Sequence, residues 1–328
     1  MRTHDGLVPV PPGTNAAALN APLDARAKGT AWASANVRAG LWIIASCFFF
    51  SAMNALAKLL VVAGGLGGLH PLQVTFARYL FAALALAPFA LRSGLRFPTG
   101  ALLGRYAVRV GAGYLGVVLM FAALRHLRLS DATAIGFTSP FFAIIAAVPL
   151  LGERADRPRW LAAIVGFIGV VAITRPTDGA VQPAALVAVL AAMAMGVEIV
   201  GVKWVSMAGT AAAVIFLSNA LAVPLGALTA LPAWQWPSGM QWIALAAIGA
   251  IAAVGQVCVL RGARLGDAAF IAPFFYFSLV FATVLGAILF SEMPPPSTVA
   301  GAAIIVGGVL YAGRAARRTA AAAAQIQR

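Results

Sequence analysis

The sequence predicts an all-α integral membrane protein with ten transmembrane helices, arranged as two inverted five-helix repeats. Three observations lead to this fold class. The chain of 328 residues is 62% hydrophobic and only 10% charged, whereas a soluble domain has about 25% charged residues. Its apolar residues come in long runs separated by short polar breaks. Several short charged phrases also occur twice, at nearly constant spacing.

The apolar runs have the length that membrane-crossing helices need. Each is roughly 17–24 residues long, enough to cross a hydrocarbon core of about 30 Å. A transmembrane barrel would show alternating segments of about ten residues instead. The breaks are rich in Gly, Pro or Arg, as in "GGLGGLHP" and "SEMPPPS". We expect spans at residues 39–62, 71–91, 107–124, 131–151, 158–174, 183–202, 210–231, 239–260, 267–290 and 296–313.

The two ends of the chain differ from the spans. Residues 1–38 hold Pro, Ala, Asn and scattered charge without a long apolar stretch, which predicts a disordered cytoplasmic tail. Residues 314–328 are basic and Ala-rich, and predict a cytoplasmic tail that continues the last helix into water. Between the tails we expect one five-helix repeat at residues 39–174 and a second at 183–313.

The distribution of positive charge predicts the orientation. With ten spans, fifteen Lys and Arg residues fall on the side of the termini and three on the other side. Cytoplasmic loops carry the excess of Lys and Arg, so both termini should be cytoplasmic. The fifteen are Arg26, Lys28, Arg38, Arg92, Arg96, Arg105, Arg154, Arg157, Arg159, Lys203, Arg261, Arg264, Arg314, Arg317 and Arg318, and the three are Arg125, Arg128 and Arg175.

The internal repeat rests on matched short phrases. "RLSDA" at residues 128–132 returns as "RLGDA" at 264–268, at an offset of 136. "SPFF" is echoed by "APFF", and "LLGE", which ends at Glu153, by "LFSE", which ends at Glu292. Each half has an odd number of expected spans, so the second half should cross the membrane upside down. This is the inverted repeat of many secondary transporters.

These phrases resemble the drug/metabolite transporter superfamily, EamA type. The resemblance is carried by "FFFSAMNALAKLL", "FARYLFAALALAPFAL" and "RLSDATAIGFTSPFFAIIAAVPLLGE", with the second copy "RLGDAAFIAPFFYFSLVFATVLGAILFSE", and it covers residues 39–313. The second copy departs by placing "MPPPS" after its Glu, where the first has "RADRPR". The resemblance implies ten helices around a central cavity and carriage of small metabolites, often outward.

Ionisable and amide side chains inside spans are the first candidates for substrate binding, because they are costly there. Ser51, Asn54 and Lys58 share one helical face, and Arg78 lies about two turns into the second span. Each has an alternative reading. Lys58 could snorkel to the interface, Arg78 could snorkel or form an ion pair, and Glu198 could belong to a structural pair. Asp131 and Asp267 favour N-capping, Glu153 and Glu292 favour holding helix ends, and Lys203 favours a topological role. Asn219 and Gln256 complete the polar candidates.

Prolines inside two matching spans predict interrupted helices near the binding region. Pro140 lies in the fourth span with Thr138 and Ser139 beside it, and Pro273 lies in the ninth with Phe274, Phe275 and Tyr276. Tyr114, Met120 and Phe121 of the third span are candidates for lining the same cavity. Ordinary helix packing is the alternative for each aromatic residue.

The residues favour a secondary transporter that moves a small metabolite by alternating access. Lys58 and Arg78 outweigh Glu198, which favours a solute with a carboxylate or phosphate, such as an amino acid or another small organic acid. A neutral or cationic solute held by aromatic and amide groups is the alternative. Glu198 is the one deep carboxylate candidate for proton coupling, so exchange or uniport is favoured over obligatory proton antiport.

Other classes of function lack their signatures. A membrane-embedded enzyme would need a nucleophile–base pair or metal ligands, and a channel a ring of like charges. Neither HExxH nor GxSxG occurs, and Cys47 and Cys258 lie inside spans. We expect no enzyme activity, cofactor, metal or nucleic-acid partner. The expected partners are the substrate, the lipid bilayer of a bacterial inner membrane, and a second copy if the Gly-rich faces of spans five and ten form a homodimer.

Overall fold

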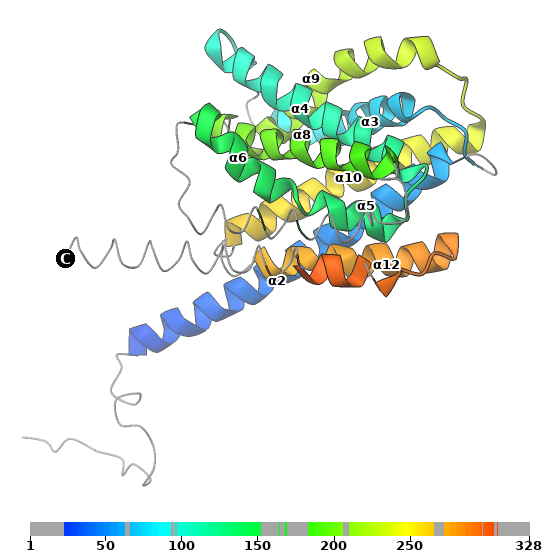
Figure 1. The fold of residues 1–328 in the computed structure, drawn as a ribbon. Coiled ribbons are helices and arrows are strands. Elements are labelled where there is room, and N and C mark those ends of the chain that lie inside the picture. Colours follow the sequence, from blue (N-terminus) through cyan, green and yellow to red (C-terminus); the bar gives the residue numbers. More distant parts are fainter. Residues whose placement is uncertain are drawn as a thin grey trace, which may run out of the picture.

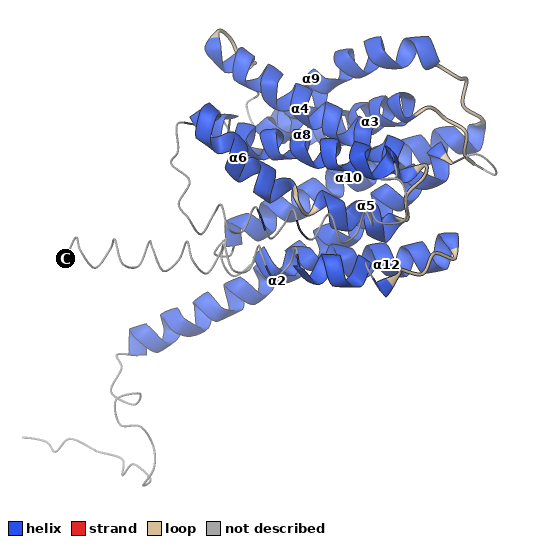
Figure 2. Ribbon diagram, in the orientation of Figure 1, coloured by secondary structure: helices blue, strands red, loops and turns tan. Residues whose placement is uncertain are grey.

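The computed structural model describes residues 23–62, 66–92, 95, 97–151, 164, 168, 183–205, 210–265, 272–296, 298–304 and 307. Within these ranges the chain is helical with short connections and contains no strand (Figure 2). The helices are α2 Leu23–Val61, α3 Pro71–Arg92, α4 Ala101–Leu124, α5 Leu129–Gly136, α6 Ser139–Leu151, α8 Pro183–Val205, α9 Ala211–Ala230, α10 Gly239–Leu265 and α12 Phe277–Phe290, with 3-10 turns η2 Leu231–Ala233 and η3 Ala272–Tyr276.

Seven segments of the described chain are long and apolar enough to cross a membrane, and a shorter apolar segment covers Phe274–Phe290. These eight correspond to predicted spans one to four and six to nine. Nearly all of predicted span five and much of span ten lie outside the described residues, as do residues 1–22 and the basic tail at 314–328. The count of ten spans therefore stays a prediction.

The first helix begins earlier than expected. Helix α2 starts at Leu23, so residues 23–38, which were predicted to be part of a disordered tail, are helical. This segment is rich in Ala, Arg and Lys, which are strong helix formers. The part of α2 that is apolar enough to span a membrane begins at Val37. The change in composition near residue 38 thus marks a change in polarity within one helix.

The fourth predicted span is broken into α5 and α6. Pro140 is the second residue of α6, where its missing N–H costs nothing because a first turn has no intrahelical acceptor for it. The carbonyl of Thr138 accepts bonds from the amides of Phe141 (2.9 Å) and Phe142 (3.3 Å), which starts the new helix. In the second half, the 3-10 turn η3 contains Pro273 and leads into α12. Interruptions at both prolines were predicted.

The described helices alternate in direction between two ends of the bundle. Val61, His70, Leu124 and Pro183 lie at one end, called here the His70 end, where the Arg125 Nε donates to the Val61 carbonyl (3.0 Å). The opposite end, the Arg92 end, holds the start of α4 and the end of α8, where Tyr106 packs with Val205. Helices α2, α4, α9 and α12 run toward the His70 end, and α3, α5–α6, α8 and α10 run away from it (Figure 1).

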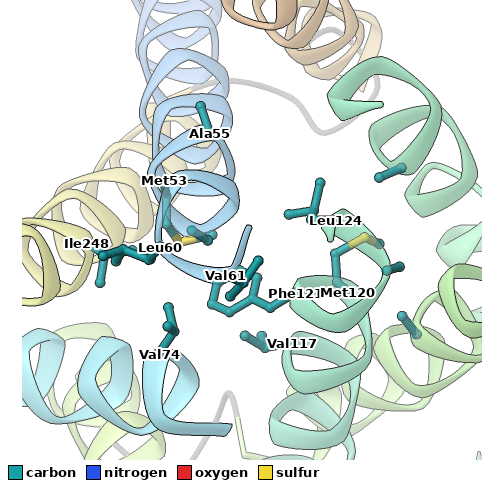
Figure 3. Close-up of a cluster of buried hydrophobic side chains, with 14 of the residues drawn as sticks. Met53, Ala55, Leu60, Val61, Val74, Val117, Met120, Phe121, Leu124 and Ile248 are labelled. Atoms are coloured by element: carbon teal, nitrogen blue, oxygen red, sulfur yellow. The ribbon is translucent and has the colours of Figure 1, made fainter. Parts of the chain in front are cut away.

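Helices from the two predicted halves pack against each other rather than forming separate bundles. Helix α4 packs on α8, α2 on α10, α3 on α9 and α10, and α6 on α8, while α12 lies along α2 and α5 (Figure 1). The largest buried cluster joins α2, α3, α4 and α10, and Leu60, Val74, Phe121 and Ile248 are among its members (Figure 3). The core therefore lies between the halves.

The outer surface suits lipid. Leu84, Phe89, Leu228 and Ile288 each expose more than half of their surface, which an aqueous protein would seldom tolerate over so many helices. At the His70 end, the Trp234 ring packs against the rings of Trp236 and Trp242. Tryptophans are enriched where a membrane protein meets the interface.

Close approach of helices depends on glycine. A β-carbon added at Gly249 of α10 would lie 2.8 Å from the amide nitrogen of Ala82 and 2.9 Å from the carbonyl carbon of Phe81, both in the backbone of α3. Backbone atoms cannot turn aside as a side chain can. Small residues at such contacts let helices pack tightly in a membrane, where the hydrophobic effect between them is absent.

We expect Gly249→Ala to destabilise the protein by about 1–3 kcal/mol, because the added methyl group forces α3 and α10 apart. Thermal unfolding of the purified protein in detergent measures this change. Gly104→Ala is the matched control, since nothing lies within 4 Å of a β-carbon at Gly104 of α4. It should be neutral or stabilise by up to about 1 kcal/mol. Equal stability of the two variants would contradict the α3–α10 packing.

Candidate functional site

Among the described residues, most side-chain hydrogen bonds between distant parts of the chain join the first predicted half to the second. The clearest are two ion pairs, Lys58 with Glu292 and Arg109 with Glu198. Three further hydrogen bonds cross between the halves in the same way: Tyr114 to Thr229, Ser51 to the Ser278 carbonyl, and Thr298 to Asp131. Buried polar groups need partners, and here the other half of the chain provides them.

Lys58 is neutralised at the His70 end. It is only 5% exposed, so it does not snorkel to the surface. Its ammonium group is paired with the Glu292 carboxylate and donates to the Leu127 carbonyl (2.7 Å). The Phe290 ring lies 4.9 Å from the same nitrogen. The charge of Lys58 is thus already matched by protein groups in this conformation.

Glu292 also caps helix α5. Its second carboxylate oxygen accepts a bond from the Leu129 amide (3.0 Å), the first residue of α5. Asp131, predicted to be the N-cap, lies within the first turn instead and accepts bonds from Thr298 (2.6 Å) and Ser130 (3.4 Å). The prediction of N-capping by Asp131 was therefore wrong. The carboxylate of Glu292, in the turn after α12, bonds to the unpaired amide at the start of α5 in place of Asp131. A negative charge is favourable at a helix N-terminus.

The turn after α12 places Glu292. Ser291 has a left-handed backbone with φ of 54°, and its amide donates to the Ala287 carbonyl (3.1 Å). The Glu292 amide then donates to the Gly286 carbonyl (3.0 Å), which directs the chain back along the helix end. The prediction that Glu292 holds helix ends together agrees with this geometry. Glu153, its counterpart in the repeat, lies outside the described residues, as does Asp267.

Arg109 was missed by the sequence analysis. It lies two residues inside the third predicted span and was not considered among the buried charges. The structure buries most of its side chain on α4, where it donates to the Ser218 hydroxyl of α9 and lies 3.9 Å from the Glu198 carboxylate. The available signal was a second arginine within an apolar run, in "RYAVRVGAGY". Glu198 therefore belongs to an ion pair, which is the structural alternative that the sequence analysis gave for it.

Two glycines make room for this pair. A β-carbon at Gly113 of α4 would lie 2.8 Å from the carboxylate carbon of Glu198, and one at Gly201 of α8 would lie 2.8 Å from the β-carbon of Arg109. Each glycine therefore faces the charged residue of the opposite helix. The close packing of α4 on α8 and the Arg109–Glu198 pair are parts of one arrangement.

A second polar group surrounds Arg78 on α3. This Arg78 cluster consists of Arg78, Tyr79, Tyr114 and Thr229. The guanidinium carbon lies 4.3 Å from the centre of the Tyr79 ring, which lies 5.9 Å from the Tyr114 ring, and the Tyr114 hydroxyl bonds to Thr229. Sequence reasoning found Arg78 and Tyr114 but missed Tyr79 and Thr229.

Arg78 lacks acceptors for part of its guanidinium group. It is 7% exposed, and within the described residues its Nε and Nη1 atoms are buried without a hydrogen-bond partner. The described part of the chain also places no carboxylate within 4.0 Å of it, since the two ion pairs found there involve Lys58 and Arg109. Arg78 is thus the buried cation that the described protein leaves without a negative partner.

The other predicted site residues fall into separate places. Asn219 donates to Gln256 (3.0 Å) and to the Ile215 carbonyl (2.8 Å), within the second half. Thr138 donates to the Ile135 carbonyl (2.6 Å), and Ser139 and Pro140 begin α6.

Phe121 is a core residue, and Asn54 is partly exposed on α2. Ser51, 1% exposed, donates to the Ser278 carbonyl (3.1 Å). Their role in binding stays a prediction.

Aromatic side chains gather near the interruptions in the helices. The Tyr276 ring lies 5.4 Å from the Phe137 ring, so the two broken spans meet there, and the Phe274 ring stacks on Phe277 at 6.5 Å. Pro273 lies in η3, and its side chain is outside the description. These contacts place the two predicted interruptions next to each other.

A cavity of about 420 Å³ opens at the His70 end. The starts of α3 and α8 and the end of α4 surround it, and His70, Arg125 and His126 contribute its polar atoms. None of the predicted substrate-binding residues lines it. Because its surface is mostly apolar and lies at the end of the bundle, we place the candidate site at the Arg78 cluster instead. Over the described residues, no three His, Cys, Asp or Glu side chains come together as metal ligands.

The Lys58–Glu292 pair should be essential for stability. We expect Glu292→Gln to destabilise the protein by about 3–5 kcal/mol, because it leaves a buried ammonium group without its counter-charge. The double variant Lys58→Met with Glu292→Gln should recover most of this loss, since no charge then remains buried. Thermal unfolding in detergent measures both. A double variant no more stable than the single one would contradict the pairing.

The EamA-like transporter family matches residues 37–175 and again 182–314. The chain is 28% identical to a riboflavin transporter of Vibrio cholerae over 79% of this chain and 87% of the other. It is 28% identical to an S-adenosylmethionine uptake transporter of Rickettsia felis, over 77% and 84%. A pseudopaline exporter of Pseudomonas aeruginosa is 27% identical over 77% and 88%. One crystal structure shares the fold, with a TM-score of 0.55 and 21% identity over 88% of this chain and 99% of that one.

Proposed function

Since the chain belongs to the EamA-like transporter family, we propose that it carries an amino acid or a related organic anion or zwitterion by alternating access. The named relatives are transporters, so this multi-pass membrane protein is a transporter of small metabolites and not an enzyme. The substrates in their names differ from one another, and each relative is less than 30% identical to this chain. The chemistry of this chain's own side chains must therefore indicate the substrate.

One positive charge that has no carboxylate partner among the described residues carries this proposal. Lys58 is matched by Glu292 and Arg109 by Glu198, which leaves Arg78. The carboxylate of Asp131, which lies in the first turn of α5, accepts a hydrogen bond from Thr298. Arg128 is the N-cap residue of the same helix. A low-dielectric interior with one unmatched cation favours a solute with a negative group. Lys58, predicted to share this role with Arg78, is already paired.

An inverted repeat would explain how the halves surround the solute. The two family matches, at residues 37–175 and 182–314, nearly coincide with the predicted halves. Corresponding helices run in opposite directions: α2 against α8, α3 against α9, and α4 against α10. The contact of α4 with α8 corresponds to that of α10 with α2, and α6 with α8 to α12 with α2. These relations support a second half that repeats the first upside down.

We further propose a cytoplasmic location for both termini in a bacterial inner membrane, with export as the direction of transport. The bias of fifteen Lys and Arg to three supports the orientation. The named relatives include both an uptake transporter and an exporter, so they do not indicate a direction. The proposal of export therefore rests on the family resemblance. Exchange is favoured over proton antiport, because Glu198 and Glu292 each have a cationic partner.

Substrate counterflow in proteoliposomes tests the transport mechanism. Amino acids, organic acids, nucleobases, vitamins and cationic dyes are screened for exchange against the same unlabelled solute. We expect an amino acid or organic acid to exchange, and Glu198→Gln to retain this counterflow, because exchange needs no proton carrier. Accumulation driven by a pH gradient that Glu198→Gln abolishes would contradict the exchange mechanism. Movement of lipophilic cations alone would contradict the substrate class.

The topology has its own test. Reporter fusions should place residues 1–38, 92–105 and 314–328 in the cytoplasm and residues 175–182 outside, because positive residues cluster near the first group. Paired alkaline phosphatase and fluorescent protein fusions measure this at each site. A fusion at the C-terminus that is active in the periplasm would rule out both ten spans and the inverted repeat.

A further inference from the structure

We propose that Arg78 is the residue that binds the oxyanion of the substrate, and that the preferred substrate is a monoanion or zwitterion. This inference rests on the proposed transport function and adds the atoms that recognise the solute. The bound group would be a carboxylate or a phosphate, both of which present oxygens to a guanidinium group. Lys58, the other deep cation singled out from the sequence, has a structural role in the Glu292 pair.

The incomplete bonding of Arg78 is the main observation. Arg78 is 93% buried, and its Nε and Nη1 atoms have no acceptor in the described chain. The Tyr79 ring, 4.3 Å from the guanidinium carbon, offers a cation–π contact, while Nε and Nη1 have no hydrogen bond to any described residue. Leaving a buried charged donor unsatisfied is costly for folding. A ligand oxygen would supply the missing acceptor.

The other buried cations show what a purely structural cation looks like here. Lys58 has a carboxylate and a backbone carbonyl, and Arg109 has a hydroxyl and a nearby carboxylate. Arg109 keeps one buried nitrogen without a partner, its Nε, but its charge is matched by Glu198. Only Arg78, among the buried Lys and Arg side chains of the described ranges, has no carboxylate within 4.0 Å.

The location of Arg78 fits a carrier's binding site. The Arg78 cluster combines α3 and α4 of the first half with Thr229 of α9 in the second half. Protein atoms cover the unpaired nitrogens in this conformation, so a solute reaches them only when the helices move apart. A site formed between two halves is one that relative motion of the halves can open and close.

Glu198 limits the charge of the solute. Its carboxylate packs against Gly113 of α4, the residue before Tyr114 of the Arg78 cluster, and its side chain is 36% exposed. A second negative charge on the solute would meet this carboxylate, whereas an ammonium group would be attracted to it. The surroundings therefore favour one net negative group at Arg78, with or without a positive group toward Glu198.

Stability without substrate provides the first test. An unmatched buried charge should weaken the empty protein, so Arg78→Met should raise its unfolding temperature in detergent by about 2 °C or more, the shift expected for roughly 1 kcal/mol. Arg109→Met, the matched control, removes a paired arginine and should lower the unfolding temperature. A decrease for Arg78→Met as large as that for Arg109→Met would show that Arg78 is structural and overturn the proposal.

Ligand-induced stabilisation provides the second test. The probes are pyruvate, L-glutamate, L-phenylalanine and inorganic phosphate, with pyruvate methyl ester and L-phenylalanine amide as neutralised counterparts. At least one oxyanion probe should raise the unfolding temperature of the unmodified protein, and Arg78→Met should abolish this shift while Lys58→Met with Glu292→Gln keeps it. Stabilisation by phosphate alone indicates that the substrate is a phosphate ester. Stabilisation by carboxylates alone indicates that the substrate is an organic acid. An equal shift in Arg78→Met would overturn the inference.

Counterflow separates this inference from the transport function. If the unmodified protein exchanges only neutral or cationic solutes, transport stands and the role of Arg78 is wrong. If it exchanges no solute, the transport proposal fails, and the effect of Arg78→Met on stability still decides whether Arg78 is a structural residue. Arg78→Lys, which keeps the charge but not the guanidinium group, should weaken the response to the oxyanion probe at least tenfold if Arg78→Met unfolds.

Discussion

A charged side chain within an apolar helical bundle needs a counter-charge, and in this protein the counter-charge comes from the other half of the chain. Lys58 and Glu292 meet this need at the His70 end, and Arg109 and Glu198 meet it between α4 and α8. Both pairs cross between the halves, as do hydrogen bonds such as those of Tyr114 with Thr229 and of Ser51 with the Ser278 carbonyl. The relative position of the halves is therefore specified by a few polar contacts, while the apolar surfaces allow close approach without directional bonds.

Glycines determine which helices approach most closely. At Gly113 and Gly201 the opposing side chains are the members of the Arg109–Glu198 pair, and at Gly249 the opposing atoms are the backbone of α3. A larger residue at these positions would push apart the helices and the charges together. Packing and charge pairing are thus coupled locally, since the same small residue that permits the helix contact also gives a carboxylate room beside its arginine.

Sequence patterns predicted the helices better than their partners. Hydrophobic run length located eight of the spans, and Pro140 and Pro273 marked real interruptions, because length, polarity and proline act locally. The capping of α5 by Glu292 could not be read in the same way, since the two residues are 163 positions apart. Arg109 was overlooked because it stands near the start of its apolar run, and Tyr79 because an aromatic residue in a span resembles ordinary packing. The Arg78 side chain was identified by burial cost alone.

The capping of α5 by Glu292 has a consequence for synthesis of the protein. The ribosome adds Glu292 163 residues after Leu129, whose amide it caps. It adds Glu292 234 residues after Lys58, the ammonium group that it neutralises. During that interval the early helices enter the membrane with an uncapped helix start and an ammonium group that lack their final acceptor. Both groups must remain near water or near the insertion machinery until the carboxyl-terminal spans arrive. The described helices of the first predicted half therefore form an assembly intermediate, and the last part of the chain to be translated completes it.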